Sequence, residues 1–430
     1  MLEKLFQLSR FGSNWRTEVL AGITTYLTMA YIIFVNPAML ADAGMDRGAV
    51  FVATCVAAAI GCLVMGLWAN LPVALAPGMG LNAFFTYGVV LGMGYTWQAA
   101  LGAVFLSGCL FILLSLFKVR EWAINAIPDT LKKAIAAGIG TFLALIALKN
   151  AGIIVDHPAT LVTLGDVTQF GPAMAILGFF LVIAFVQRNV PGAVMLAILL
   201  VTAAAIMFGK VEYHGVVSTP PSIAPTFMQM DLAAALDVAM LSVIFAFLFV
   251  DLFDTSGTLI AVTQRAGLIK EDGQVPRLKQ ALMADSTATV AGAVLGTSTT
   301  TSYVESAAGV AAGGRTGLTA VVVGVLFLLS IFFAPLAGMI PAYATAGAIF
   351  YVSILMLFTL KDVNWDDLTE AAPVGVVLLL TPLTFSIAHG ITLGFITYAL
   401  AKVLAGKTHE LSGAVWVLSA LLLLKVIFVR

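Results

Sequence analysis

Long apolar stretches separated by short polar connections run along the whole chain. A helix needs about 20 mostly apolar residues to cross the hydrocarbon core of a bilayer. Twelve stretches approach that length: roughly 17–36, 49–69, 97–117, 133–150, 172–187, 190–209, 237–263, 281–296, 317–338, 343–360, 371–388 and 390–405. We expect each of them to be a transmembrane helix.

Two further apolar segments, 72–90 and 296–314, are interrupted in the middle. Pro77, Gly78 and Gly80 break the first as a helix, and the Ser/Thr run at 297–301 favours an extended chain in the second. We expect a short strand and a half-helix in each. Lipid cannot satisfy the freed backbone groups, so they must face protein or water. One such break alone would be a structural kink, whereas matched breaks in both halves favour a binding site.

Counting both broken segments as crossings gives fourteen, and the distribution of Lys and Arg supports this count. With the N-terminus inside, sixteen of the 21 Lys and Arg fall on inner connections and three, Arg47, Lys149 and Lys210, on outer ones. Lys425 and Arg430 belong to a leftover apolar stretch and are unassigned. If either broken segment were not counted as a crossing, the later connections would change sides and the excess of Lys and Arg on the inside would be lost. We therefore expect a multi-pass protein of the cell inner (plasma) membrane with a cytoplasmic N-terminus.

Fourteen crossings divide into two halves of seven, and an odd number places the second half upside down relative to the first. The broken segment is the third crossing of each half. Ile127-Pro128 precedes the small-residue run AIAAGIG, and Ile340-Pro341 precedes AYATAGAI. These matches favour an internal duplication. The predicted fold class is an all-α polytopic membrane protein with a 7+7 inverted repeat, in which spans 3 and 10 are each a short extended strand plus a half-helix.

Composition excludes several classes of protein. Hydrophobic residues make up 61% of the chain and charged residues 10%, against about 45–50% and about 25% in soluble domains, which excludes a soluble enzyme. A net charge of -1 gives no basis for binding nucleic acid. The spacing of the four His residues fits no metal site. We expect no cofactor, no metal and no catalytic residues.

Three acidic residues lie where hydropathy disfavours them. Asp251 and Asp254 fall near the middle of the eighth span, and Glu305 begins the second half-helix. A charge at the bilayer centre costs about 2.5–3.5 kcal/mol, so these side chains should face a cavity. Without Lys or Arg at similar depth, desolvation and mutual repulsion favour their protonated forms, as a proton-coupled carrier requires. The alternative, strongest for Asp251, is that the acid bonds freed backbone N–H groups. Asp285 is expected near the inner end of the ninth span, in a structural role.

The surroundings of these acids limit the ligand. Carboxylates without a cationic partner suit a neutral or cationic molecule rich in N–H donors and repel an anion. Aromatic residues flank the breaks, since Phe84 and Phe85 follow Asn82 and Tyr303 precedes Glu305. A flat heterocycle could stack on one of these rings while its edge bonds a carboxylate. For any single Phe, ordinary packing is the alternative.

Several long motifs together identify a family resemblance. The chain resembles the AzgA-like purine permeases, in the nucleobase-cation symporter-2 group of the nucleobase/ascorbate transporters, over roughly Leu5 to Lys407. The motifs are GITTYLTMAYIIFVNP, ANLPVALAPGMGLNAFF, LFDTSGTL, YVESAAGVAAGGRTGLTAVVVG, YATAGA and VNWDD. The resemblance implies import of purine bases with protons by a homodimer in the lipid bilayer.

The resemblance also implies roles for residues. Asp254 takes the place of the eighth-span acid that contacts the base or couples the proton, and Glu305 that of the tenth-span acid that bonds the base edge. Ala83 and Phe84 correspond to the third-span contacts. The complete expected substrate-binding set is Glu305, Asp254, Ala83, Phe84, Asn82, Tyr303 and Ser306, and the proton-coupling set is Glu305, Asp254 and Asp251. Better-studied relatives have Glu in the eighth span, so the shorter Asp254 would reach the base through water.

Finally, the resemblance implies a core domain that moves against a gate domain. The core would comprise 1–118 (spans 1–4) and 235–338 (spans 8–11), and the gate 133–210 (spans 5–7) and 343–405 (spans 12–14). An extra apolar helix would follow at 411–429. The expected function is import of adenine, guanine and/or hypoxanthine by proton symport. A same-fold carrier of xanthine, uracil or an anion stays open. A membrane-embedded hydrolase with a metal is disfavoured, because no His lies within a span.

Overall fold

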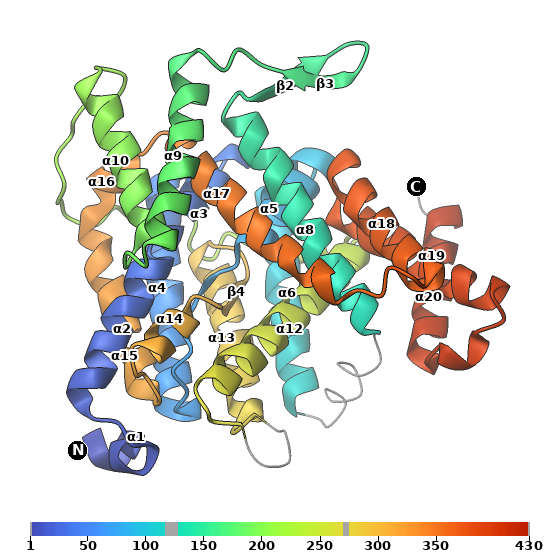
Figure 1. Cartoon of the computed structure of the whole chain (residues 1–430), viewed down its shortest axis with the longest axis horizontal. Coiled ribbons are helices and arrows are strands. Elements are labelled where there is room, and N and C mark those ends of the chain that lie inside the picture. Colours follow the sequence, from blue (N-terminus) through green and yellow to red (C-terminus); the bar gives the residue numbers. More distant parts are fainter. Residues whose placement is uncertain (1, 117–127, 270–274, 429–430) are drawn as a thin grey trace.

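The computed structural model describes residues 2–116, 128–269 and 275–428. Helices dominate these residues, and the N-terminus lies at the opposite end of the bundle from a small β-hairpin (Figure 1). We call these two ends the N-terminal side and the hairpin side. Several residues used in the sequence predictions lie outside the described part: Lys118, Arg120 and Lys270 of the inner connections, Ile127 of the first Ile-Pro pair, and Arg430.

The first half of the chain combines long helices with short helical and extended elements. They follow in the order α1 (Leu2–Phe6), η1 (Leu8–Phe11), α2 (Trp15–Met29), α3 (Ile32–Asp42), α4 (Arg47–Val64), η2 (Met65–Ala69), β1 (Leu75–Pro77), α5 (Met79–Ala83), η3 (Phe84–Gly92), α6 (Trp97–Leu116), α8 (Asp129–Asn150), β2 (Ile154–His157), β3 (Leu161–Leu164), α9 (Phe170–Gln187) and α10 (Ala193–Met207). The strands β2 and β3 form the hairpin.

The second half repeats the pattern of long helices around one broken segment. Its elements are α11 (Leu232–Ala235), α12 (Val238–Arg265), α13 (Leu278–Leu295), β4 (Thr300–Ser302), α14 (Ser306–Ala311), α15 (Gly317–Ser330), η4 (Ile331–Phe333), α16 (Ala334–Met339), α17 (Ala342–Leu357), η5 (Phe358–Asp362), α18 (Leu368–Leu383), α19 (Ile387–Leu404), η6 (Thr408–Glu410) and α20 (Gly413–Phe428). Helix α20 packs on α19.

The polytopic, all-α membrane fold is confirmed. Among the described residues, nine helical segments are long and apolar enough to cross a membrane. The segments Met79–Gly92, Ala193–Met207 and Leu368–Leu383 are apolar but shorter. The count of fourteen crossings stays a prediction, since the two broken segments and the short helices do not meet that length on their own.

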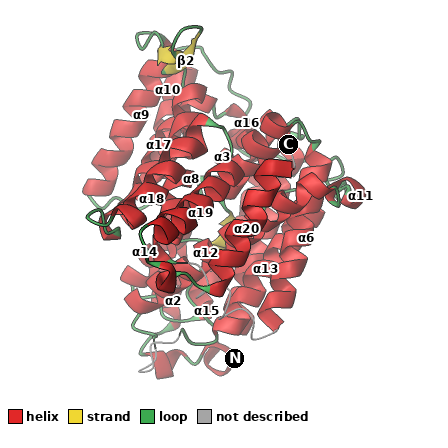
Figure 2. Cartoon of the chain, turned by 90° about the vertical axis from the view of Figure 1, so that its right-hand side faces the viewer, coloured by secondary structure: helices red, strands yellow, loops and turns green. Residues whose placement is uncertain are grey.

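The two predicted breaks are confirmed as strand-plus-half-helix segments. Strands β1 and β4 pair antiparallel, with Ala76 opposite Thr301, and each leads into a helix, α5–η3 in the first half and α14 in the second. Both strands are fully buried, and both views place them in the middle of the bundle (Figures 1 and 2). Equivalent segments of an inverted repeat run in opposite directions, so their pairing is antiparallel.

Gly80 differs from its predicted role as part of the break. The extended chain ends at Pro77, Gly78 precedes the helix with φ −77° and ψ 121°, and Gly80 is already helical within α5. A Cβ at Gly80 would lie 2.5 Å from Cγ2 of Ile139 on α8. The glycine is therefore needed for the close approach of α5 to α8 rather than for breaking the helix.

The prolines of the two Ile-Pro motifs, Pro128 and Pro341, occupy equivalent positions in the halves. Pro128 directly precedes α8 and Pro341 directly precedes α17, and both have extended backbone with ψ of 144° and 155°. The two helices pack against each other along the small residues that follow. A Cβ at Gly140 of α8 would lie 2.9 Å from the carbonyl oxygen of Ser353 on α17. The sequence repeat thus corresponds to a symmetric helix pair.

Candidate functional site

The predicted acids of the eighth span and of the second half-helix meet at the centre of the bundle. Glu305 lies at the start of α14, and Tyr31 donates a hydrogen bond from its hydroxyl to Oε1 of Glu305 at 2.7 Å. Asp254 lies on α12 within electrostatic range of Glu305. Glu305 is half-buried and Asp254 is exposed. Two carboxyl groups therefore face one accessible place from different helices.

The face of α12 that carries Asp254 is exposed in only one direction. Toward the N-terminal side, Gly257 and Ala261 are exposed and Thr258 between them is 7% exposed, and a Cβ at Gly257 would meet no atom within 4 Å. Toward the hairpin side, Val250 is 4% exposed and Phe247 0%. Residues three and four apart share a helix face, so the site is open toward the N-terminal side and closed toward the hairpin side.

Asp251 and Asp285 form a second, deeper acidic pair. Asp251 is 2% exposed and accepts a hydrogen bond from Thr289 at 3.3 Å. Asp285 is fully buried and accepts from the Thr255 hydroxyl at 2.6 Å and from Ser302 at 3.2 Å. The predicted position of Asp285 near the end of its span is wrong: α13 begins at Leu278, so Asp285 lies mid-helix, beside β4.

These deeper acids leave hydrogen-bonding capacity unused. Oδ1 of Asp251 and Oδ2 of Asp285 have no hydrogen-bond partner among the described residues. The two carboxyl groups also interact electrostatically with each other. Buried polar atoms are normally paired, so the hydrogen bonding of this pair is incomplete among the described residues.

The third-span residues of the predicted site are more enclosed than the acids. Asn82, Ala83 and Phe84 are each 0% exposed. The Asn82 side chain accepts a hydrogen bond from the Ser298 hydroxyl at 2.5 Å, while its Nδ2 has no partner among the described residues. The ring of Phe84 packs on Phe247 of α12 with centroids 5.0 Å apart. Asn82 thus connects the two broken segments.

Tyr303 and Ser306 also connect the two breaks. The Tyr303 hydroxyl donates to the carbonyl oxygen of Pro77, and the Ser306 hydroxyl accepts from the backbone N–H of Ala74 at 2.9 Å. The backbone N–H of Gly78 donates to Thr299 at 2.9 Å. In this conformation, the hydrogen bonds of Tyr303 and Ser306 hold β1 and β4 together at their crossing beneath Glu305.

Among the described residues, no cation forms an ion pair with the acids of the site. Within the ranges that the structure covers, the ion pairs involve none of Asp251, Asp254, Asp285 and Glu305. No group of three or more His, Cys, Asp and Glu among those same residues could hold a metal ion. The arrangement is suited to accepting hydrogen bonds from a ligand and to binding protons.

Sequence reasoning missed two tyrosines of the site. Tyr31 lies at the bend between α2 and α3, and its hydroxyl reaches Glu305. Tyr351 of α17 is half-buried and within electrostatic range of Glu305. Tyr31 belongs to the motif MAYIIF, but nothing in that motif marks it as different from a packing residue. Only the bend after Ala30 aims it at Glu305.

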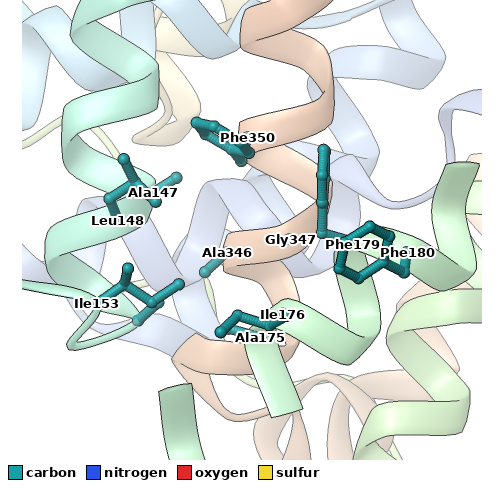
Figure 3. A pocket seen from close by; sticks show the side chains of 11 residues that line it. Ala147, Leu148, Ile153, Ala175, Ile176, Phe179, Phe180, Ala346, Gly347 and Phe350 are labelled. Atoms are coloured by element: carbon teal, nitrogen blue, oxygen red, sulfur yellow. The ribbon is translucent and has the colours of Figure 1, made fainter. Parts of the chain in front are cut away.

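An apolar cavity lies away from these acids. It has a volume of about 240 Å³ and is enclosed by α8, α9 and α17, where Figure 3 shows Phe179, Phe350 and Ile176 around it. All of its lining residues are apolar. It offers no partner for a polar ligand, so the acids at the strand crossing are the better candidate site.

Comparison with known sequences gives the family. A sequence model described as a permease family matches residues 16–393. This chain belongs to that permease family. It is 51% identical to adenine permease AdeP of Escherichia coli (strain K12), covering 100% of this chain and 96% of the relative. It is 46% identical to guanine/hypoxanthine permease PbuG of Bacillus subtilis (strain 168), covering 100% of both.

Solved structures show the same fold at low sequence identity. The transmembrane domain of a cyanobacterium bicarbonate transporter, BicA, superimposes with a TM-score of 0.66 at 17% identity, covering 87% of this chain and 97% of that domain. The structure of SLC26A9 matches with a TM-score of 0.67 at 12% identity, covering 90% of this chain and 65% of that one. The permease is therefore a membrane transporter built on the fold that these proteins share.

Proposed function

We propose that this permease imports the purine nucleobases adenine, guanine and/or hypoxanthine together with protons across the cell inner membrane. The observation that carries the proposal is that Asp254 and Glu305 face one accessible place, with no ion pair to a Lys, Arg or His of the described part of the chain. Such a site accepts hydrogen bonds from N–H groups, which line the edges of purines. Relatives named as adenine and guanine/hypoxanthine permeases support the same class of substrate.

Glu305 is the proposed primary contact to the base. It stands at the start of α14 and is held by the Tyr31 hydroxyl through Oε1, which leaves its other oxygen for the ligand. Asp254 approaches from α12, so a flat base between the two would be bonded along its edge. Phe84, packed on Phe247, forms part of the wall on the side of the first break.

The proposed movement is that of a core domain, 1–118 and 235–338, against a gate domain, 133–210 and 343–405. The side-chain bonds between the two breaks lie inside the proposed core and support its moving as one body. The gate helices α8 and α17 pack on each other across the two halves. A homodimer and a cytoplasmic N-terminus complete the proposal, supported by the resemblance and by the distribution of Lys and Arg.

Substrate binding is tested with Glu305→Gln. The change keeps the shape and replaces one carboxyl oxygen by an NH2 group, which cannot accept a hydrogen bond from the base; an unmade bond of this kind costs about 1–3 kcal/mol, so adenine or guanine binding should weaken about five- to hundredfold. The purified variant is titrated with each base by calorimetry. Glu212→Gln on an exposed loop is the matched control and should bind normally. Unchanged binding by Glu305→Gln would contradict the assignment, and competition by uracil, xanthine and bicarbonate tests the alternative cargoes.

Proton coupling is tested separately in proteoliposomes. A pH gradient that is acidic outside the vesicles should drive accumulation of labelled base inside them, and a protonophore should abolish this accumulation. Asp254→Asn removes one proton-binding group. The variant should still exchange base across the membrane, but it should no longer accumulate base in response to the pH gradient. If the unsubstituted protein accumulates base independently of the pH gradient, proton symport is refuted, whereas the proposal of purine transport still holds.

A further inference from the structure

A hydrogen-bonded trio on the hairpin side links three elements. The Tyr87 hydroxyl on η3 donates to Oδ2 of Asp42, the last residue of α3, at 2.6 Å. The side-chain amide of Asn150, the last residue of α8, donates to the same hydroxyl at 3.0 Å. Tyr87 is 7% exposed, whereas Asp42 and Asn150 are exposed. The tyrosine hydroxyl thus acts as donor and acceptor at once.

The two bonds of this hydroxyl differ in what they join. Asp42 and Tyr87 belong to the first four spans, and Asn150 ends the fifth span. In the proposed division, the Tyr87–Asp42 bond lies within the core, whereas the Asn150–Tyr87 bond crosses from gate to core. Asp42 orients the hydroxyl so that its lone pair faces α8, and Arg47 lies within electrostatic range of Asp42.

The trio lies on the side from which the acidic site is closed. On the Asp254 face of α12, Val250 and Phe247 toward the hairpin side are buried, whereas Gly257 and Ala261 toward the N-terminal side are exposed and Thr258 between them is 7% exposed. The half-helix α5–η3 that carries Tyr87 packs against α8. A passage from the hairpin side to the acids must separate these two elements, and the Asn150–Tyr87 bond must then break.

We propose that Asp42, Tyr87 and Asn150 form a latch that holds the transporter closed on the hairpin side, with the Asn150–Tyr87 bond as its state-dependent part. The proposal rests on the core-against-gate movement of the proposed function. A neutral hydrogen bond contributes enough to shift a two-state ratio about fivefold. Loss of this bond should raise the population open on the hairpin side by that factor.

The test measures how often the closed face of α12 becomes accessible. A reporter cysteine replaces Val250, which is 4% exposed, and the half-buried Cys109 is replaced by Ser. Labelling of Val250→Cys by a maleimide is followed in purified protein without substrate. Its rate follows the fraction of time spent open. Tyr87→Phe and Asn150→Ala should each speed labelling about fivefold, and the double variant no further, because both remove the Asn150–Tyr87 bond. Tyr87→Phe also removes the bond to Asp42, which lies within the proposed core.

Two controls make the result decisive. Tyr26→Phe removes a hydroxyl whose bond to Ser330 lies wholly within the proposed core, and it should leave the labelling rate unchanged. The native Cys55 and Cys62 are fully buried and report general loosening. Equal rates for Tyr87→Phe and Tyr26→Phe would overturn the latch, as would faster labelling of Cys55 alongside the reporter. Because no base is added, failure of purine binding would leave this result standing.

Discussion

The contact of Gly80 with α8 predicts how one added methyl group would change the resting state. In Gly80→Ala, the new Cβ would lie 2.5 Å from Cγ2 of Ile139, whereas ordinary contacts lie at 3.4–4 Å. The half-helix and α8 must separate by about 1 Å. Overpacking of this kind costs about 1–3 kcal/mol. The closed arrangement should lose that much relative to one in which α5 has moved along α8.

The assay is the labelling of the Val250→Cys reporter. A cost of about 1–3 kcal/mol corresponds to roughly a five- to hundredfold shift of the two-state ratio, so labelling should speed up within that range. Ile139→Ala removes Cγ2 and should restore the original rate in the double variant. Gly375→Ala is the matched control, because its added Cβ on α18 would meet no atom within 4 Å.

Two outcomes would refute this reasoning. A labelling rate unchanged by Gly80→Ala would mean that α5 and α8 do not separate when the site opens on the hairpin side. If labelling becomes faster and Ile139→Ala does not restore the original rate, then the change in labelling arises inside the core. Either result would also remove the support that this contact gives to movement between the proposed core and gate.

Two further predictions concern the ends of helices. Glu18 is fully buried and accepts hydrogen bonds from the backbone N–H groups of Arg315 and Thr316 and from the Thr319 hydroxyl. Glu18→Ala should therefore lower the free energy of unfolding by about 3–5 kcal/mol and lower the melting temperature in detergent. A substitution of the exposed Glu3 is the control and should not do so. The Lys407 ammonium and then Thr369 hold the pKa of Asp367 well below its usual range. The resulting stabilisation is complete above about pH 4 and is lost as pH falls toward the lowered value. Asp367→Asn should make the acid-side fall of the melting temperature shallower, and an unchanged fall would contradict this.

Much of the scaffold could be predicted because bilayer crossing leaves a strong one-dimensional signal. The expected span 133–150 is α8, Asp129–Asn150, and the expected span 237–263 is α12, Val238–Arg265. The breaks could be predicted because Pro77 and the Ser/Thr run before Tyr303 exclude a continuous helix. The count of crossings could not be settled in this way, since short helices such as α10 fall below the length needed to cross a bilayer.

The parts of the site that sequence reasoning missed depend on contacts between distant segments. Asp285 was assigned a structural role near the end of its span, but α13 places it mid-helix against Thr255 and Ser302. Tyr31 acquires its role from the bend between α2 and α3. The sequence predicts that Gly80 breaks a helix, whereas in the structure Gly80 packs closely against Ile139, which lies on another helix. Local composition carries no information about such partners.

The distribution of polar contacts indicates at which boundary the proposed movement would separate the chain most easily. Within the strand crossing, Ser298–Asn82 and Ser306–Ala74 are buried bonds, and separating them would strand polar groups at a cost of about 1–3 kcal/mol each. At the boundary with α8, the contacts are the apolar approach at Gly80 and one bond to Asn150, whose side chain is exposed and can bond water instead. The cheaper separation is therefore between α5–η3 and α8. A base held by Glu305 and Asp254 would travel with both breaks as one unit.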